Sequence, residues 1–134
     1  MRYFTDLEIL TINKFILASK PRYSRVNYIQ HNDRLQFLIE YANKKGSYFG
    51  LQRLSTIYHV AAAYLYFIIK DHIFYDACKR TAVTVMTTFL TNNQYKVKKK
   101  LSRIKLTELA LKVEKNVYTL DQLARFLQEH AYKG

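Results

Sequence analysis

Four side chains that can carry acid–base or phosphate chemistry lie within nine consecutive residues of this sequence: His72, Asp76, Lys79 and Arg80. His72 closes an apolar segment predicted to be a helix, and an imidazole at that place can serve as a general base. Asp76 is a hard oxygen ligand that can hold one face of Mg²⁺ while phosphate oxygens and water supply the rest. Residues 77–80 lead into the next predicted helix, so their backbone N–H groups and two cationic side chains form an anion site.

Phosphoryl or nucleotidyl transfer to a hydroxyl group needs a base, a carboxylate that binds a metal ion and a cationic anion site, and this stretch can supply all three. The sequence contains no zinc-ligand spacing, no glycine-rich phosphate loop and no nucleophilic serine elbow. A nucleophilic Cys78 beside His72 is a weaker alternative, because nothing orients the pair and a residue at a helix start more readily serves packing. Taken singly, each residue also fits an ordinary helix–loop–helix with solvated charges.

The segments before this turn must position it, and their apolar periodicity predicts helices. A capping box at Thr5–Glu8 begins a helix that runs to about Lys20 and ends at Pro21. Asn32 caps a second helix, which closes at Lys44 and Lys45 before Gly46. The segment Gly46 to Gly50 is either a substrate-aligning flap or a tight connection.

The central helix is predicted from about Arg53 or Ser55 to Asp71 and is apolar nearly all round, as expected for a helix surrounded by others. His59 within it is best read as a hydrogen-bonded structural residue and not as a ligand. Three further helices follow, with apolar stripes over Ala82 to Leu90, Leu106 to Val113 and Leu120 to Ala131. We therefore expect an all-α, compact single domain of about six helices spanning residues 1–134, with no central strand.

The chain is strongly basic, with 22 Lys and Arg against 10 Asp and Glu and a net charge of +12. This charge favours a polyanion, a nucleotide or an acidic protein as partner. The lysine-dense stretch Tyr95 to Lys100 alternates in a short extended pattern, and it is either a solvated connection or a nucleic-acid patch. It lacks interleaved aromatic residues beyond Tyr95, which argues against nucleic acid as the partner.

Cysteine usage and hydropathy predict the compartment. Cys78 is the only cysteine, and no signal peptide is evident at the N-terminus, so a reducing cytoplasm is the expected location. The longest uncharged apolar run, Val60 to Ile69, is far shorter than the roughly 20 residues that span a bilayer, so no membrane segment is expected.

The turn resembles the signature of the Fic/Doc superfamily, and specifically its death-on-curing (Doc) branch, where the pattern is H-x-F-x-D-[AG]-N-K-R-T-A. The residues that carry this likeness are His72-Ile73-Phe74-Tyr75-Asp76-Ala77-Cys78-Lys79-Arg80-Thr81-Ala82. The Fic branch would continue through G-N-G-R and a further arginine, whereas Lys79 stands at the second glycine here. The likeness extends to the flanking helices and, in order and length, to the whole chain.

The resemblance implies a bundle of about six helices and the toxin of a toxin–antitoxin pair, which uses ATP and Mg²⁺ to phosphorylate a threonine of elongation factor Tu and so inhibits translation. His72 would be the general base, Phe74 the ring that pins the loop, and Asp76 the Mg²⁺ carboxylate. Lys79 and Arg80, with the backbone amides of Ala77 and Cys78, would hold the nucleotide phosphates. The implied partner is a small antitoxin whose disordered segment folds into a groove on the toxin.

Cys78 departs from the pattern, which has asparagine at this position. A thiol is a weak donor and acceptor, and loss of one charge-assisted contact costs about 1.5–3 kcal/mol, or roughly a factor of ten to a hundred in rate. Backbone contacts at this position survive the change, which favours a reduced or altered enzyme over an inactive one. The alternatives are an AMP transferase of Fic type and a catalytically silent Fic-fold protein that acts by binding.

Overall fold

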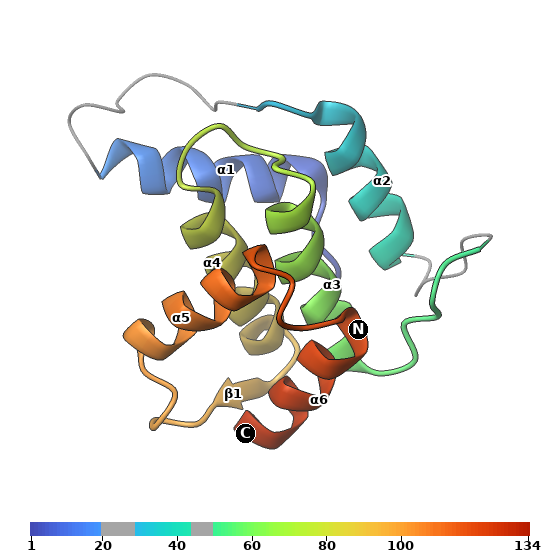
Figure 1. Ribbon diagram of the computed structural model, residues 1–134, viewed down its shortest axis with the longest axis vertical. Helices are drawn as coiled ribbons and strands as arrows, with labels where there is room; N and C mark the ends of the chain where they lie inside the picture. Colours follow the sequence, from blue (N-terminus) through green and yellow to red (C-terminus); the bar gives the residue numbers. More distant parts are fainter. Residues whose placement is uncertain (20–28, 44–49) are drawn as a thin grey trace.

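Six helices and one short two-stranded ribbon make up the part of the chain that the computed structural model describes, residues 1–19, 29–43 and 50–134 (Figure 1). The expected mostly helical, compact fold with six helices is confirmed. The elements in chain order are α1 (Asp6–Ala18), α2 (Asn32–Asn43), α3 (Ile57–Lys70), α4 (Cys78–Asn92), β1 (Tyr95–Val97), α5 (Arg103–Glu114), α6 (Leu120–His130) and β2 (Ala131–Lys133).

Side-chain caps fix the starts of most helices. The Thr5 hydroxyl accepts the Glu8 N–H while the Glu8 carboxylate accepts the Thr5 N–H, and Thr119 and Gln122 form the same reciprocal pair at α6. Both predicted capping boxes are thus confirmed. At α2 the first helical hydrogen bond runs from the Leu35 N–H to the carbonyl of residue 31, so the predicted cap at Asn32 is wrong by one residue. The predicted end of α2 at residues 44–46 lies outside the described residues.

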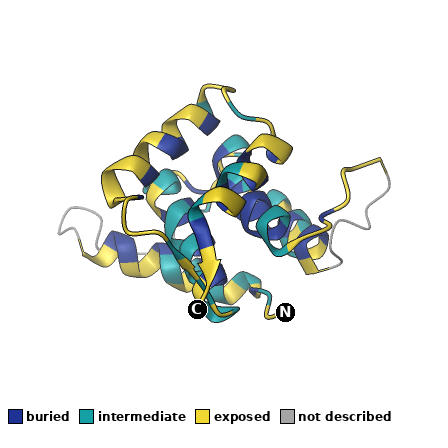
Figure 2. Cartoon of the chain, turned by 90° about the horizontal axis from the view of Figure 1, so that it is seen from below, coloured by how far each residue is buried: buried dark blue, intermediate teal, exposed yellow. Residues whose placement is uncertain are grey.

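Helix α3 is the centre of the fold and packs most extensively against α4 and α6. Residues 60–65 are all fully buried, so the apolar character on every side of this helix reflects neighbours on every side (Figure 2). The His59 ring lies 2.7 Å from the Thr56 hydroxyl through Nδ1 and 2.9 Å from the Asp121 carboxylate through Nε2, which confirms the structural reading of this histidine. Neither α3, with its 14 residues, nor any other helix in the described residues is long and apolar enough to cross a bilayer.

The extended pattern predicted at Tyr95 to Lys100 is confirmed for Tyr95–Val97, but the pairing of this strand with the C-terminal residues was not predicted. Strands β1 and β2 are antiparallel, with Lys96 opposite Tyr132 and Val97 opposite Ala131. The prediction that the last helix includes Ala131 is wrong, because α6 ends at His130 and Ala131 is already extended. The carbonyl of His130 accepts the N–H of Lys98 instead of continuing the helix, so a partner more than 30 residues away ends α6.

Candidate active site

The loop between α3 and α4 carries the candidate site, and its entry is a tight helix C-terminus. The N–H of His72 donates to the carbonyl of Ile69 (3.2 Å) and the N–H of Ile73 donates to that of Ile68 (3.3 Å), the two bonds of a Schellman motif. The left-handed position of this motif usually belongs to glycine, yet here His72 occupies it with φ of 46°. A left-handed histidine at an exposed helix end is a strained position of the kind that concentrates at functional sites.

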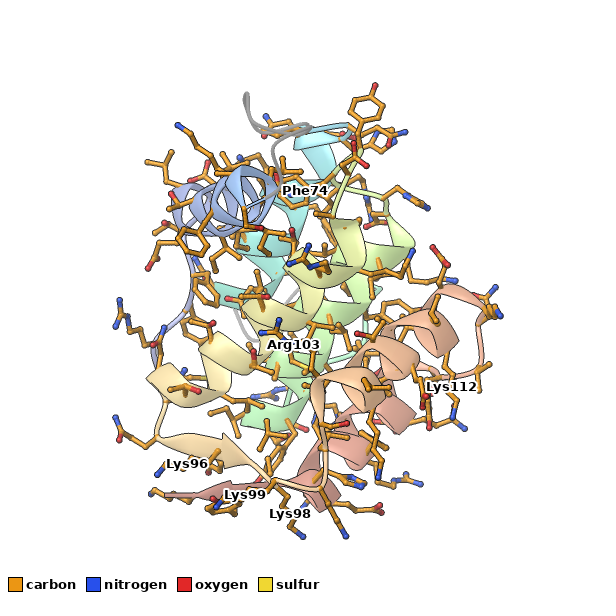
Figure 3. The ribbon with its side chains drawn as sticks, turned by 90° about the vertical axis from the view of Figure 1, so that its left-hand side faces the viewer. Phe74, Lys96, Lys98, Lys99, Arg103 and Lys112 are labelled. Carbon is orange, nitrogen blue, oxygen red and sulfur yellow. The ribbon has the colours of Figure 1, made fainter. Side chains whose placement is uncertain are left out.

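The middle of the loop is anchored from two sides. Phe74 is fully buried, as the resemblance implied, and forms an isolated antiparallel bridge with Ile29 (Figure 3). The carbonyl of Ile73 accepts the N–H of Gln30 at 2.8 Å and that of His31 at 3.3 Å. The segment 29–31 therefore contacts the loop, whereas the predicted flap at 46–50 lies outside the described residues except for the exposed Gly50.

Helix α4 begins without a side-chain cap. Ala77 at the N-cap has φ of 55° and makes no capping hydrogen bond through its side chain, and the first helical bond runs from the Thr81 N–H to the Ala77 carbonyl at 2.8 Å. The amides of Cys78, Lys79 and Arg80 precede that bond, so they belong to the turn whose N–H groups have no carbonyl partner within the helix. These amides lie at the positive end of the helix dipole, which is the arrangement expected of an anion site.

Asn13 of α1 is a site residue that sequence reasoning missed. It is completely buried, and its Nδ2 donates to the carbonyl of Asp76 (3.3 Å) and to the hydroxyl of Thr81 (3.0 Å), which is also completely buried. One amide thus joins the end of the loop to the first turn of α4. The available signal was an asparagine four residues after Ile9 on the apolar stripe of the helix, where a polar side chain needs a specific partner.

The thiol of Cys78 faces the protein. Its Sγ donates to the carbonyl of Ile68 at 3.0 Å, and burial raises the pKa of the thiol. Cys78 therefore connects the start of α4 to the end of α3, the bracing that an asparagine could also supply. At neutral pH the sulfur is held as a protonated hydrogen-bond donor, which disfavours the nucleophile alternative.

Lys79 and Arg80 line a groove of about 590 Å³ between α1, α4 and α5, together with Phe15 and Arg103. Lys79 is not free in this arrangement, since its Nζ lies 3.3 Å from a carboxylate oxygen of Glu114. Arg80 is exposed. Arg103, a groove residue in the first turn of α5, adds a cation that the motif does not contain (Figure 3).

Comparison with known proteins places this geometry in a family. The model of the Fic/DOC family matches residues 3–90, about two thirds of the chain, including the whole loop, α1 to α3 and most of α4. This chain belongs to the Fic/DOC family. Comparison with curated proteins gives no significant match. Fic/DOC proteins are generally transferases that act on proteins, and they typically use ATP and Mg²⁺.

The described residues of this Fic/DOC protein are chemically compatible with a magnesium nucleotide. They include an uncapped helix start and two cationic side chains for phosphate, and Asp76 for the metal. No group of three His, Cys, Asp or Glu side chains in the described part of the chain could hold a metal ion by itself. Mg²⁺ bound here would therefore take phosphate oxygens and water for most of its ligands, as Mg²⁺ commonly does.

Proposed function

We propose that this Fic/DOC protein is a Doc-like toxin that transfers a phosphate from ATP to a hydroxyl group of a translation factor such as elongation factor Tu, and so inhibits translation. The observation that carries the proposal is the uncapped start of α4, which lies on one short loop with His72 and Asp76 and continues into Lys79 and Arg80. Lys79 stands where the Fic branch has its second glycine, which favours the Doc branch.

In the proposed reaction each residue has a distinct task. His72 accepts the proton of the target hydroxyl as its oxygen bonds to the terminal phosphorus of ATP, and the bond from that phosphorus to the departing ADP oxygen breaks. The amides of the first turn of α4 and the guanidinium of Arg80 stabilise the charge that develops on the phosphate oxygens. Asp76 would hold Mg²⁺, and the ion would supply neutralisation of the phosphate charge.

Two contacts adjust this assignment. Lys79 pairs with Glu114, and both side chains are about a third exposed, so a phosphate competes with a partly screened ion pair worth about 0.2–1 kcal/mol. The Cys78 thiol braces the loop through Ile68, so the loop keeps its position without the asparagine of the family pattern. These contacts favour a weakened or altered enzyme over a catalytically silent protein.

The proposed antitoxin occupies the groove of Lys79 and Arg80. The groove is lined by Phe15, a large apolar side chain that is 77% exposed, and by Arg103. An amphipathic segment with apolar residues for Phe15 and acidic residues for the three cations would match both features. A segment bound there would cover Arg80 and thereby block the phosphate site.

Induced expression in bacteria tests the proposal through growth and through mass spectrometry of the purified target incubated with ATP. We compare wild type with His72→Ala, Cys78→Asn and the matched control His31→Ala, which removes an exposed histidine at the start of α2. Wild type and His31→Ala should arrest growth and add a phosphate, and His72→Ala should do neither.

The other outcomes identify the alternatives. A target that gains AMP would make the protein a Fic-type AMP transferase. If His72→Ala is as toxic as wild type, the assignment of the base is wrong. If wild type is harmless and Cys78→Asn arrests growth, the cysteine is a disabling substitution and the natural protein acts by binding.

A further inference from the structure

Half of the net charge of the chain lies in a region that the proposed reaction does not require. Residues 96–115 contain eight Lys or Arg and two Glu, a net charge of +6 out of +12 for the whole chain. They form β1, α5 and the connections on either side, beyond the part matched by the family model. In Figure 3, Lys96, Lys98 and Lys99 gather at the ribbon end of the molecule. A cationic surface of this density attracts anionic partners.

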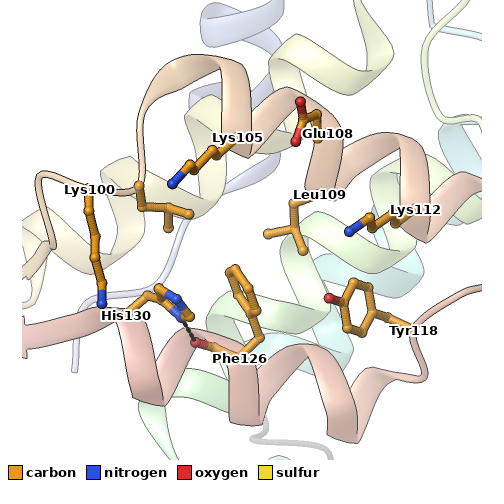
Figure 4. Close-up of a pocket in the computed structure, with 9 residues that line it drawn as sticks. Lys100, Lys105, Glu108, Leu109, Lys112, Tyr118, Phe126 and His130 are labelled. Atoms are coloured by element: carbon orange, nitrogen blue, oxygen red, sulfur yellow. Dashed lines mark hydrogen bonds between the residues drawn. The ribbon is translucent and has the colours of Figure 1, made fainter.

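A pocket lies within this region, between α5 and α6. Its volume of about 310 Å³ is at the lower end of the range of about 300–1,000 Å³ that is typical of small-ligand sites. Three ammonium groups and three rings line it, from Lys100, Lys105, Lys112, Tyr118, Phe126 and His130. Figure 4 shows Lys105 and Lys112 extending from α5 above the ring of Phe126, with Lys100 beside His130. The pocket thus combines an aromatic floor with cationic walls.

Two rings of the floor are already stacked on each other. The rings of Phe126 and His130 have centroids 4.1 Å apart and planes 19° apart, and the ring of Tyr118 lies at 54° to that of Phe126 with centroids 6.1 Å apart. The Nδ1–H of His130 donates to the Phe126 carbonyl at 2.8 Å, which fixes the orientation of the imidazole (Figure 4). All three rings are only half-buried, so part of the stack remains accessible to a planar group.

We propose that this pocket is a binding site for single-stranded nucleic acid, in which one base stacks on the rings of α6 and the flanking phosphates contact Lys100, Lys105 and Lys112. Stacking platforms inside cationic grooves are the usual means by which proteins bind unpaired strands. The lysine stretch by itself lacks aromatic residues beyond Tyr95, but the fold supplies Tyr118, Phe126 and His130 from 18 or more positions further along the chain.

The ribbon extends the same surface beyond the pocket. Lys98, the residue directly after β1, is joined to the end of α6 by the hydrogen bond from its N–H to the His130 carbonyl, so the lysine stretch begins beside the aromatic floor. Opposite Lys96, Tyr132 is 45% exposed and offers a further ring. A nucleic-acid strand of several nucleotides can therefore contact cations and rings in succession. A free nucleotide would reach only part of this surface, and an acidic peptide would use its cations but not its rings.

Among the described residues, Glu108 is the one carboxylate that lines the pocket, and it predicts a base preference. A carboxylate repels phosphate but accepts a hydrogen bond from an exocyclic amino group such as N4 of cytosine. The site should therefore prefer oligocytidylate to oligouridylate. This preference should be lost in Glu108→Gln.

The test is fluorescence anisotropy of the full chain with a labelled oligocytidylate at near-physiological salt. The variant Lys100→Gln/Lys105→Gln/Lys112→Gln should bind at least about tenfold more weakly. The matched control Lys14→Gln/Arg53→Gln/Arg125→Gln removes the same charge from exposed positions outside the pocket and should stay within about twofold of wild type. Phe126→Leu should lose about tenfold through stacking, and His130→Leu tests the same platform if Phe126→Leu does not fold.

Three results would overturn the site. The first is a triple-lysine pocket variant that binds oligocytidylate no more weakly than the control variant does. The second is that the ring variants bind oligocytidylate as wild type does while a polyglutamate peptide competes fully with it. The third is that free cytidine monophosphate binds more tightly than oligocytidylate. His72→Ala should bind oligocytidylate as wild type does, because the site shares no residue with the proposed transferase chemistry. Failure of one proposal is thus distinguishable from failure of the other.

Discussion

The contact between Asn13 and the start of α4 gives the most quantitative prediction. Asn13→Ala removes the amide that donates to the Asp76 carbonyl and to the Thr81 hydroxyl. Both Asn13 and Thr81 are completely buried, so water cannot replace the lost donor without opening the structure. The variant should therefore destabilise the protein at the loop that carries the candidate site.

The magnitude follows from burial. A hydrogen bond contributes about 1 kcal/mol net, and a buried polar group left without its partner costs about 1–3 kcal/mol. With the small void left by the shorter side chain, Asn13→Ala should lower the free energy of unfolding by about 2–4 kcal/mol. That is a large fraction of the 5–15 kcal/mol that is typical of a folded domain.

Urea unfolding followed by circular dichroism measures the change, and a double-mutant cycle isolates the pair. Thr81→Val keeps the shape of the side chain but removes its hydroxyl, and it leaves the contact from Asn13 to the Asp76 carbonyl in place. The double variant should be less destabilised than the sum of the single variants by about 1 kcal/mol. Effects that add to within about 0.3 kcal/mol would refute the inference that these two side chains depend on each other.

Three further predictions concern the same loop. Because burial raises the pKa of the Cys78 thiol, iodoacetamide should modify this thiol more slowly at pH 8 than it modifies free cysteine, and the rate should still rise at higher pH. The free energy of unfolding should fall as the pH rises from the thiol pKa of the unfolded chain to that of the folded chain. Mass spectrometry and unfolding at several pH values test both effects, and a modification rate equal to that of free cysteine contradicts the prediction. Glu114→Gln removes the carboxylate that pairs with Lys79, so calorimetry should show up to about fivefold tighter ATP binding. The control Glu129→Gln, at an exposed position, should leave ATP binding unchanged. Unchanged or weaker binding by Glu114→Gln contradicts the phosphate role of Lys79. Ala77→Gly should raise the free energy of unfolding by about 0.5–1 kcal/mol. The left-handed backbone costs alanine about 1–2 kcal/mol, which glycine avoids, but part of this stabilisation is lost because glycine gives the unfolded chain more entropy. A variant that unfolds at lower urea concentration than wild type would contradict the left-handed geometry.

Local features of the fold were predictable because they depend on neighbours in the sequence. The capping boxes at Thr5 and Thr119 need only residues three apart, and the apolar surface of α3 follows from its own composition. The motif from His72 to Arg80 is likewise a contiguous stretch. Composition and spacing therefore determined the six helices and the position of the candidate site along the chain.

Tertiary structure decided how that site is held and what surrounds it. The hydrogen bond of Asn13 to Thr81 joins residues 68 positions apart, and the ion pair of Lys79 with Glu114 joins residues 35 apart. The β1–β2 ribbon and the aromatic floor beneath Lys105 likewise join distant segments. No local pattern encodes such contacts, because they depend on the angles at which helices pack and on which side chains then meet. The sequence by itself determined the chemistry of the loop, and only the packed chain showed what braces it and which rings face the lysines.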